Sequence, residues 1–128
     1  MAELSDYLEN KLLDHVLRGT SYTSPTTVYV GLYTSDPGDD NSGTEVSGGS
    51  YARQAISVTT ASGGIVTSSA DIQFPQATGD WGSVSHIGLL DAVTSGNLLM
   101  YTPLTTTKLI ETGDIFKVAA GSLTAQLD

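Results

Sequence analysis

Two histidines are the residues of this chain best suited to acid–base or nucleophilic catalysis. His86 lies in Val84–Gly88, close to several serines and aspartates, so a Ser–His–Asp hydrolase must be considered. Such an enzyme holds its serine on a strained turn, often within G-x-S-x-G, and the sequence has no such motif. Ser and Thr make up one-quarter of the chain, so a serine near a histidine is expected by chance. We therefore predict no catalytic residue, and we expect His86 to be hydrogen-bonded at a sheet or subunit contact.

The acidic loop, Ser35–Ser50, contains the hard oxygen ligands that Ca²⁺ uses in proteins. The candidate ligands are Asp36, Asp39, Asp40, Asn41 and Glu45. Their spacing does not match the D-x-[DN]-x-[DN]-G-x₅-E pattern of calcium loops, and acidic surface loops are usually solvated. We therefore predict no metal site, and nothing else in the sequence indicates a cofactor.

Three further aspartates could supply the paired carboxylates of a glycoside hydrolase: Asp71, Asp80 and Asp91. The last two lie beside turn residues, where an aspartate commonly caps local amide groups. The chain also has one Trp and two Phe, too few for a row of rings that stack on sugars. Capping is the simpler interpretation of these residues.

The charge balance is strongly acidic, because 5 Lys and Arg oppose 14 Asp and Glu in 128 residues, for a net charge of −9. No cluster of cations is present to displace the counterions of a nucleic acid, and the same charge disfavours anionic membranes. No apolar run approaches the roughly 20 residues of a membrane span, and no signal-peptide core is visible. The absence of cysteine excludes disulfides and thiolate metal sites. We predict a soluble protein that binds neither nucleic acid nor membrane.

An amphipathic helix is predicted in residues 1–19. Ser5 or Asp6 can serve as its N-cap, and Gly19 as the residue that ends it. Leucines and a valine at helical spacing form one broad apolar face, made of Leu8, Leu12, Leu13, Val16 and Leu17. A helix of about 13 residues does not persist alone in water, so this face must dock on the β domain or on a neighbouring protein. Leu8, Leu12, Val16 and Leu17 are therefore interface candidates.

Residues 26–128 show the period-two alternation of β-strands, separated by Gly, Pro, Asn and Asp turns. The predicted strands are Thr26–Ser35, Tyr51–Thr60, Ile65–Phe74, Val84–Asp91, Asn97–Thr102, Thr105–Glu111, Ile115–Ala119 and Leu123–Leu127. Short strands without intervening helices indicate an antiparallel β-sandwich or jelly-roll-like fold. We expect residues 1–128 to form a single domain, mainly β, with one N-terminal helix.

The aromatic residues indicate where this fold makes its larger contacts. Trp81 follows a tight-turn aspartate, and we expect it to anchor the core or a subunit contact rather than to stack on a ligand. Tyr29 and Tyr33 share the strand face opposite Val28, Val30 and Leu32. That second face is more apolar than a solvated strand needs, so we expect it to contact another sheet or subunit. Tyr29, Tyr33, Trp81 and His86 complete the interface candidates.

Nearly the whole chain resembles a family of small virion proteins of tailed bacteriophages, labelled tail-fibre or head-decoration proteins. The resemblance is carried by the strings SDYLENKLLDH, TTVYVGLYTSDP, EVSGGSYARQA, FPQATGDWGSVSHIGLLDA, GNLLMYTPLTTTK and GDIFKVAAGSL. These are structural strings and name no active site. The resemblance implies a β-sandwich or jelly-roll-like module that acts by assembly as a homotrimer, made in the host cytoplasm and placed on the particle surface.

Two functions follow from this resemblance. In the first, the chain is a capsid-decorating (cement) protein whose trimers bridge subunits of the major capsid protein and so stabilise the head. In the second, it is a short tail-fibre or receptor-binding module that contacts other tail proteins, and Ser35–Ser50 and Thr78–Ser83 face the host. A fibre needs separate attachment and receptor-binding regions, and 128 residues leave little room for both. We therefore expect decoration.

Overall fold

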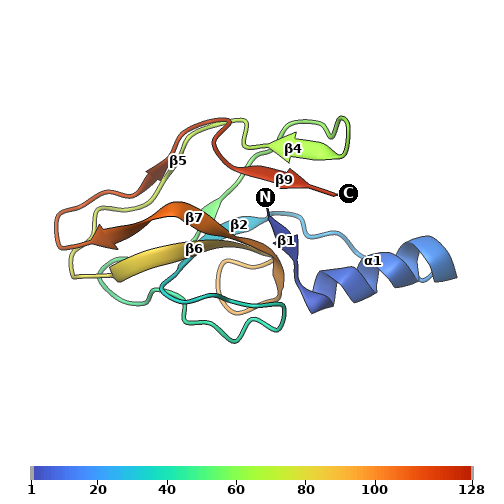
Figure 1. The fold of residues 1–128 in the computed structure, drawn as a ribbon, viewed down its shortest axis with the longest axis horizontal. Helices are drawn as coiled ribbons and strands as arrows, with labels where there is room; N and C mark the ends of the chain where they lie inside the picture. Colours follow the sequence, from blue (N-terminus) through green and yellow to red (C-terminus); the bar gives the residue numbers. More distant parts are fainter. Residues whose placement is uncertain (1, 128) are drawn as a thin grey trace.

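The computed structural model describes residues 2–127, which form an antiparallel β fold with one α-helix at the N-terminal end (Figure 1). The helix is α1 (Asp6–Arg18). The strands are β1 (Glu3–Leu4), β2 (Tyr29–Tyr33), β3 (Gln54–Ala55), β4 (Ile65–Thr67), β5 (Ile72–Gln73), β6 (Gly82–Leu90), β7 (Leu98–Ile110), β8 (Lys117–Val118) and β9 (Thr124–Gln126). The predicted fold class, mainly β with an N-terminal helix, is confirmed.

Local sequence signals set both ends of α1. Ser5 is the N-cap, and its hydroxyl accepts the N–H of Leu8 at 3.2 Å. Gly19 ends the helix in the left-handed conformation, with φ of 69°, and donates its N–H to the carbonyl of Asp14. The helix and its caps are therefore as predicted. Among residues 2–127, no helix is long and apolar enough to cross a membrane.

A five-stranded sheet in the order β1-β7-β6-β2-β3 forms the first layer, and all its pairings are antiparallel. Its longest strand, β7, joins the two segments predicted as separate strands at 97–102 and 105–111. The pairing with β6 is interrupted by a bulge at this junction, where residues 104–107 of β7 lie opposite the single residue Ser85 of β6. The short strand β1 was not predicted, and it exists only through its pairing with Tyr101 and Met100 of β7.

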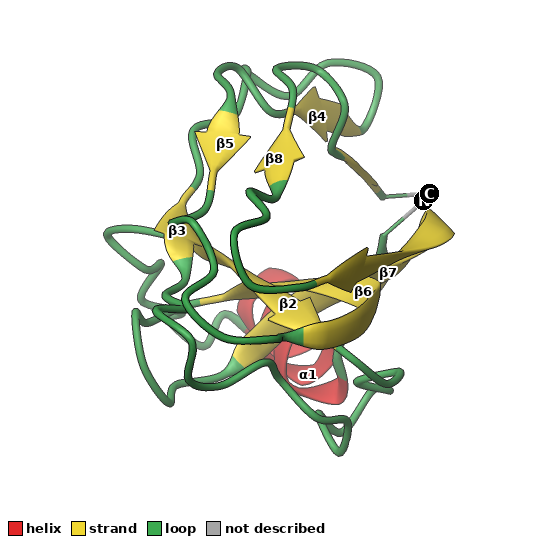
Figure 2. Ribbon diagram, turned by 90° about the vertical axis from the view of Figure 1, so that its left-hand side faces the viewer, coloured by secondary structure: helices red, strands yellow, loops and turns green. Residues whose placement is uncertain are grey.

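Two small ladders, β4–β9 and β5–β8, lie over one face of this sheet and form the second layer (Figure 2). Aliphatic and aromatic side chains fill the space between the layers, including Val30, Leu32, Phe74, Trp81, Val84, Ile87 and Phe116. The jelly-roll topology is not confirmed. A jelly roll has eight strands in two Greek keys, whereas residues 2–127 form one five-stranded sheet and two two-stranded ladders.

Five predicted strands are shorter than their hydrophobic patterns indicate: 26–35, 51–60, 65–74, 115–119 and 123–127. Within 51–60 the ordered strand is β3 alone, and 65–74 contains β4 and β5 with a break between them. The buried Ser68 lies at this break, where its hydroxyl accepts the N–H groups of Gly121 and Leu123 at 3.1 and 3.3 Å. The chain changes partner there, from β9 to β8.

The second face of the main sheet carries a smaller cluster, made of Tyr33, Leu90, Leu98 and Tyr101. The loop at 36–42 covers it. The hydroxyl of Tyr33 donates to Oδ1 of Asn41 at 3.0 Å, and the hydroxyl of Tyr101 donates to the carboxylate of Asp39. The chain's own loop therefore covers Tyr33, where the sequence predicted a contact with another sheet or another subunit.

Candidate functional site

The apolar stripe of α1 is divided between the body of the protein and solvent. Leu8 and Leu12 are half-buried near the start of the helix, where it leaves β1 (Figure 1). Leu13, Val16 and Leu17 are exposed over 56%, 71% and 75% of their surface. None of the helix residues is buried. Within residues 2–127, the distal half of α1 therefore lacks the apolar cover that its sequence predicts.

Trp81 is an internal anchor of this chain. Its side chain is 5% exposed, and Nε1 donates to the carbonyl of Gly49 at 2.9 Å. The indole makes edge contacts with the rings of Tyr51 and Phe74, at centroid distances of 5.4 and 6.5 Å. Of the two expected positions, the core and a subunit contact, the ring occupies the core of this chain, so Trp81 is not exposed as an interface residue and offers no platform for stacking a ligand.

His86 is hydrogen-bonded, as expected, and its side chain is 17% exposed. The hydroxyl of the neighbouring Ser85, which lies at the bulge in the sheet, is 2.7 Å from Nδ1, while Nε2 lies 3.9 Å from Oδ1 of Asp36. A catalytic triad needs both contacts within about 3.2 Å, so the contact with Asp36 is too long. Tyr29, the remaining interface candidate, is half-buried in β2, where it pairs with Leu90.

A charged network that the sequence did not predict joins three segments beside β2. The carboxylate of Glu45 accepts hydrogen bonds from Nε and Nη2 of Arg53, at 2.8 and 2.7 Å, and from the hydroxyl of Tyr51 at 2.6 Å. Nη1 of Arg53 donates to the carbonyls of Ala92 and Ser95, each at 2.8 Å. This network fixes the acidic loop and the β6–β7 turn to the sheet.

Burial and these contacts shift the pKa values of the network. The hydrogen bonds that Arg53 donates to Glu45 raise the pKa of Arg53, and burial is the largest cause of the raised pKa of Tyr51. Burial, together with the nearby Glu45 carboxylate, also raises the pKa of Tyr33 to about 12. The phenols are therefore neutral and the Arg53 guanidinium is charged at physiological pH. The only signal in the sequence is the short distance along the chain between Glu45, Tyr51 and Arg53.

The acidic loop is folded by its own polar side chains. Oδ1 of Asp36 accepts the N–H of Gly38 at 2.9 Å, and Oδ1 of Asp40 accepts the N–H of Ser42 at 3.2 Å. Each of the other proposed Ca²⁺ ligands accepts a hydroxyl or guanidinium hydrogen bond: Asp39, Asn41 and Glu45. The five side chains point to different partners and do not converge on one centre.

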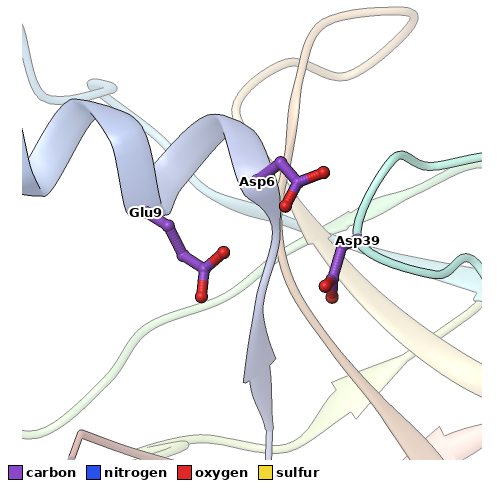
Figure 3. A group of neighbouring side chains, drawn as sticks. All are labelled: Asp6, Glu9 and Asp39. Carbon is purple, nitrogen blue, oxygen red and sulfur yellow. The ribbon is translucent and has the colours of Figure 1, made fainter.

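One acidic cluster is formed by residues from different segments. Ligand atoms of Asp6 and Glu9 in α1 and of Asp39 in the loop lie within 4.8 Å of one another, and Figure 3 shows the three side chains around the start of the helix. All three are exposed. The first-turn acids are stabilised by the positive end of the helix dipole, and Asp39 accepts the hydroxyl of Tyr101 and so raises the pKa of that phenol. This gives the cluster a structural role without an ion.

The three remaining aspartates cap backbone groups. Oδ1 of Asp80 accepts the N–H of Thr112 at 3.0 Å, and Oδ1 of Asp91 accepts the N–H of Asn97 at 2.7 Å. Asp71 accepts the N–H of Ala120 at 2.8 Å. The capping predicted for Asp80 and Asp91 is confirmed, and each carboxylate belongs to a separate turn.

Two turns meet at the end of the molecule far from α1, where β6 starts and β7 ends (Figure 1). The segments 76–81 and 111–115 exchange backbone hydrogen bonds, including Ala77 N–H to the carbonyl of Asp114 at 2.9 Å and Gly113 N–H to that of Ala77 at 2.7 Å. The loop at 48–50 joins them, because Thr78 donates its N–H to the carbonyl of Gly49 at 3.0 Å. This turn surface therefore lies at the opposite end from the helix.

Comparison with known proteins gives one family. A family model described as "Podophage GP4 fiber I protein gp80" matches residues 3–126. The comparison with curated proteins gives no match. The matched range includes α1, every strand of the main sheet and both turns at the far end.

Proposed function

Because this chain belongs to the family of the podophage GP4 fiber I protein gp80, we propose that it is a tail-fibre module of a phage particle that acts by assembly and contact. The family is one of phage fibre structural proteins, which agrees with the resemblance to virion proteins in the sequence strings. A location on the virion follows from this membership. The tail position, the contact with the host and the oligomeric state are proposals.

The family match is the observation that carries this proposal. It covers residues 3–126, so the fibre description applies to nearly the whole chain rather than to one shared segment. The match supports the tail-fibre function better than capsid decoration. It therefore reverses the preference for capsid decoration that we drew from the length of the chain.

The geometry supports the same choice. The argument against a fibre was that so short a chain lacks room for separate attachment and receptor-binding regions. Figure 1 shows α1 at one end of the long axis and the start of β6 at the other. The fold therefore has two separate ends, one for attachment and one for receptor binding. We assign attachment to the α1 end, where Leu13, Val16 and Leu17 are exposed.

We assign contact with the host to the turn surface at 76–81 and 111–115. Most of its exposed side chains are polar, including Asp80, Glu111 and Asp114, and Ile115 adds one apolar side chain that is 52% exposed. Hydrogen bonds hold the turns together, for example from the Gln76 side chain to the carbonyl of Gly113 at 2.9 Å. A pre-ordered polar surface binds a host glycan or protein without a large loss of loop entropy. Only part of the acidic loop, at 48–50, belongs to this end, because Asp39 lies beside Asp6 at the helix.

A homotrimer is the oligomeric state that we propose. The resemblance implies it, and the exposed apolar helix face supports association of some kind. Sedimentation equilibrium of the purified protein should give three times the chain mass of 13.3 kDa.

Immunogold electron microscopy of intact virions tests the tail assignment. Antibody against this chain should label the tail region, and particles from a phage that lacks the gene should show background labelling only. Labelling over the whole head would overturn the proposal in favour of capsid decoration. Cross-linking within virions identifies the neighbours, which we expect to be tail proteins rather than the major capsid protein.

A further inference from the structure

An apolar groove of about 540 Å³ lies between the start of α1, the segment 25–28 and the β4–β9 ladder. Its lining includes Leu8, Ile56, Val58, Val66, Leu99 and Leu123, and none of the described residues that line it is charged. Val58 remains 50% exposed at its wall. The groove is thus an open apolar surface in a protein whose other surfaces are rich in hydroxyl and carboxylate groups.

The exposed face of α1 has the form of a segment that binds such a groove. Leu13, Val16 and Leu17 follow the i, i+3, i+4 spacing by which an amphipathic helix anchors in an apolar groove. The face is also continuous with the groove, because Leu8 and Leu12 belong to the same helix stripe and Leu8 lines the groove. The two surfaces therefore match in chemistry and adjoin in space.

The helix of the same chain does not reach its own groove with these residues. Asp6 donates its N–H to the carbonyl of Asp39 at 2.9 Å, and the Ser5 hydroxyl bonds to β7, so the start of α1 is held on two sides. From this point the helix runs away from the body of the molecule (Figure 1). A second copy of the chain can supply the missing cover, since every copy carries one helix and one groove.

Charge favours a copy of this chain as the partner. The segment 10–20 carries Lys11, Arg18 and Asp14, a net charge of +1, in a chain whose net charge is −9. The rest of each copy therefore carries −10. Docking places this weakly cationic end of one copy on an uncharged groove of another, so the contact avoids the repulsion expected between the acidic surfaces of two copies.

We propose that α1 of one copy docks Leu13, Val16 and Leu17 in the groove of a neighbouring copy. Two copies can exchange helices reciprocally, and three can close a ring in which each helix enters the next groove. The contact deepens the proposed assembly function and names the surface through which copies associate. It concerns the purified protein, so it stands or falls separately from the position of the chain on a virion.

Substitutions on the two surfaces test the contact by native mass. Leu17→Asp on the helix and Val58→Asp in the groove should each reduce the mass of the assembly to that of one chain, with an unchanged circular dichroism spectrum. Leu109→Asp is the matched control, because Leu109 is 59% exposed but lies on neither surface. A monomeric wild-type protein overturns the proposal, as does an assembly that survives both surface substitutions or is lost only in the control.

Disulfide trapping tests the pairing directly, because the chain has no cysteine of its own. Proteins carrying Leu13→Cys, Val16→Cys or Leu17→Cys are each mixed with Val58→Cys protein and oxidised. At least one mixture should give a disulfide between helix and groove cysteines of different chains, since such a bond needs Cα atoms within about 7 Å. Cross-links only between helix cysteines would show helix-to-helix packing and overturn the proposal, as would the absence of cross-links.

Discussion

Gly31 of β2 and Gly88 of β6 are register partners at the centre of the main sheet. Both positions exclude a side chain. A Cβ on Gly88 would lie 2.7 Å from Cε1 of Tyr33, and one on Gly31 would lie 2.9 Å from Cδ1 of Leu90 and 3.0 Å from Oε2 of Glu45. The paired glycines thus leave the space that the Tyr33 ring and the Glu45 carboxylate occupy.

The substitution Gly88→Ala should destabilise the fold by about 1–3 kcal/mol, because the Tyr33 ring is buried and cannot move away without disturbing the cluster around it. Urea denaturation measures the change. Gly79→Ala is the matched control, since a Cβ there meets its nearest atom at an ordinary 3.5 Å, and it should be nearly neutral. Equal losses in the two variants would contradict the crowding at Gly88.

Loss of the Arg53 side chain should destabilise the fold more than Gly88→Ala does. Arg53→Met leaves the Glu45 carboxylate without its partner at a site where the two side chains are 8% and 22% exposed, so we expect a loss of roughly 3–5 kcal/mol. The double variant Glu45→Gln, Arg53→Met removes both charges and should lose less than Arg53→Met alone. A double-mutant cycle in urea measures this coupling, and additive effects would contradict it.

The buried phenols should make the fold sensitive to alkali. The folded-state pKa of Tyr33 is about 12, raised from an unfolded value of about 10, so the neutral phenol makes its full contribution to the stability of the fold below pH 10. Above that pH the unfolded chain ionises first, and stability falls as the pH rises towards 12. The free energy of unfolding should fall as the pH rises across this range, and it should fall less steeply in the Tyr33→Phe variant. A variant profile parallel to that of the wild type would show that Tyr33 is not responsible.

The N-cap serine links the helix to the sheet. Ser5 is 1% exposed, and its hydroxyl caps Leu8 and donates to the carbonyl of Leu98. Ser5→Ala removes both contacts and should cost about 1–2 kcal/mol, with a smaller helical signal in circular dichroism. Ser122→Ala, at an exposed serine, is the control. Unchanged stability of Ser5→Ala would mean that packing alone positions α1.

Removal of divalent cations should leave the melting temperature unchanged. The acids of the loop already accept hydrogen bonds from protein groups, and the exposed cluster of Asp6, Glu9 and Asp39 includes two acids stabilised by the helix dipole. Differential scanning calorimetry with and without a chelator provides the measurement. A lower melting temperature with the chelator would show that a bound cation contributes to the fold.

The sequence predicts the features that depend on neighbouring residues. Helical spacing, Ser5 and Gly19 define α1, because capping groups act within one turn of the backbone. Alternation and turn residues locate β2 and β6 to within a few residues, since side chains of a strand alternate between faces whatever its partner. The strings quoted above likewise identify the family without any knowledge of strand order.

Only the tertiary structure decides the contacts between distant segments. The strand β1 has two residues and forms through β7, more than 90 positions along the chain, so no local pattern indicates it. The pairing of Glu45 with Arg53 and the cover of Tyr33 by the loop likewise depend on where the sheet brings these segments. Burial is a property of the assembled layers, and this is why Tyr33 and Trp81 lie inside while Val16 and Leu17 of the predicted docking face are exposed.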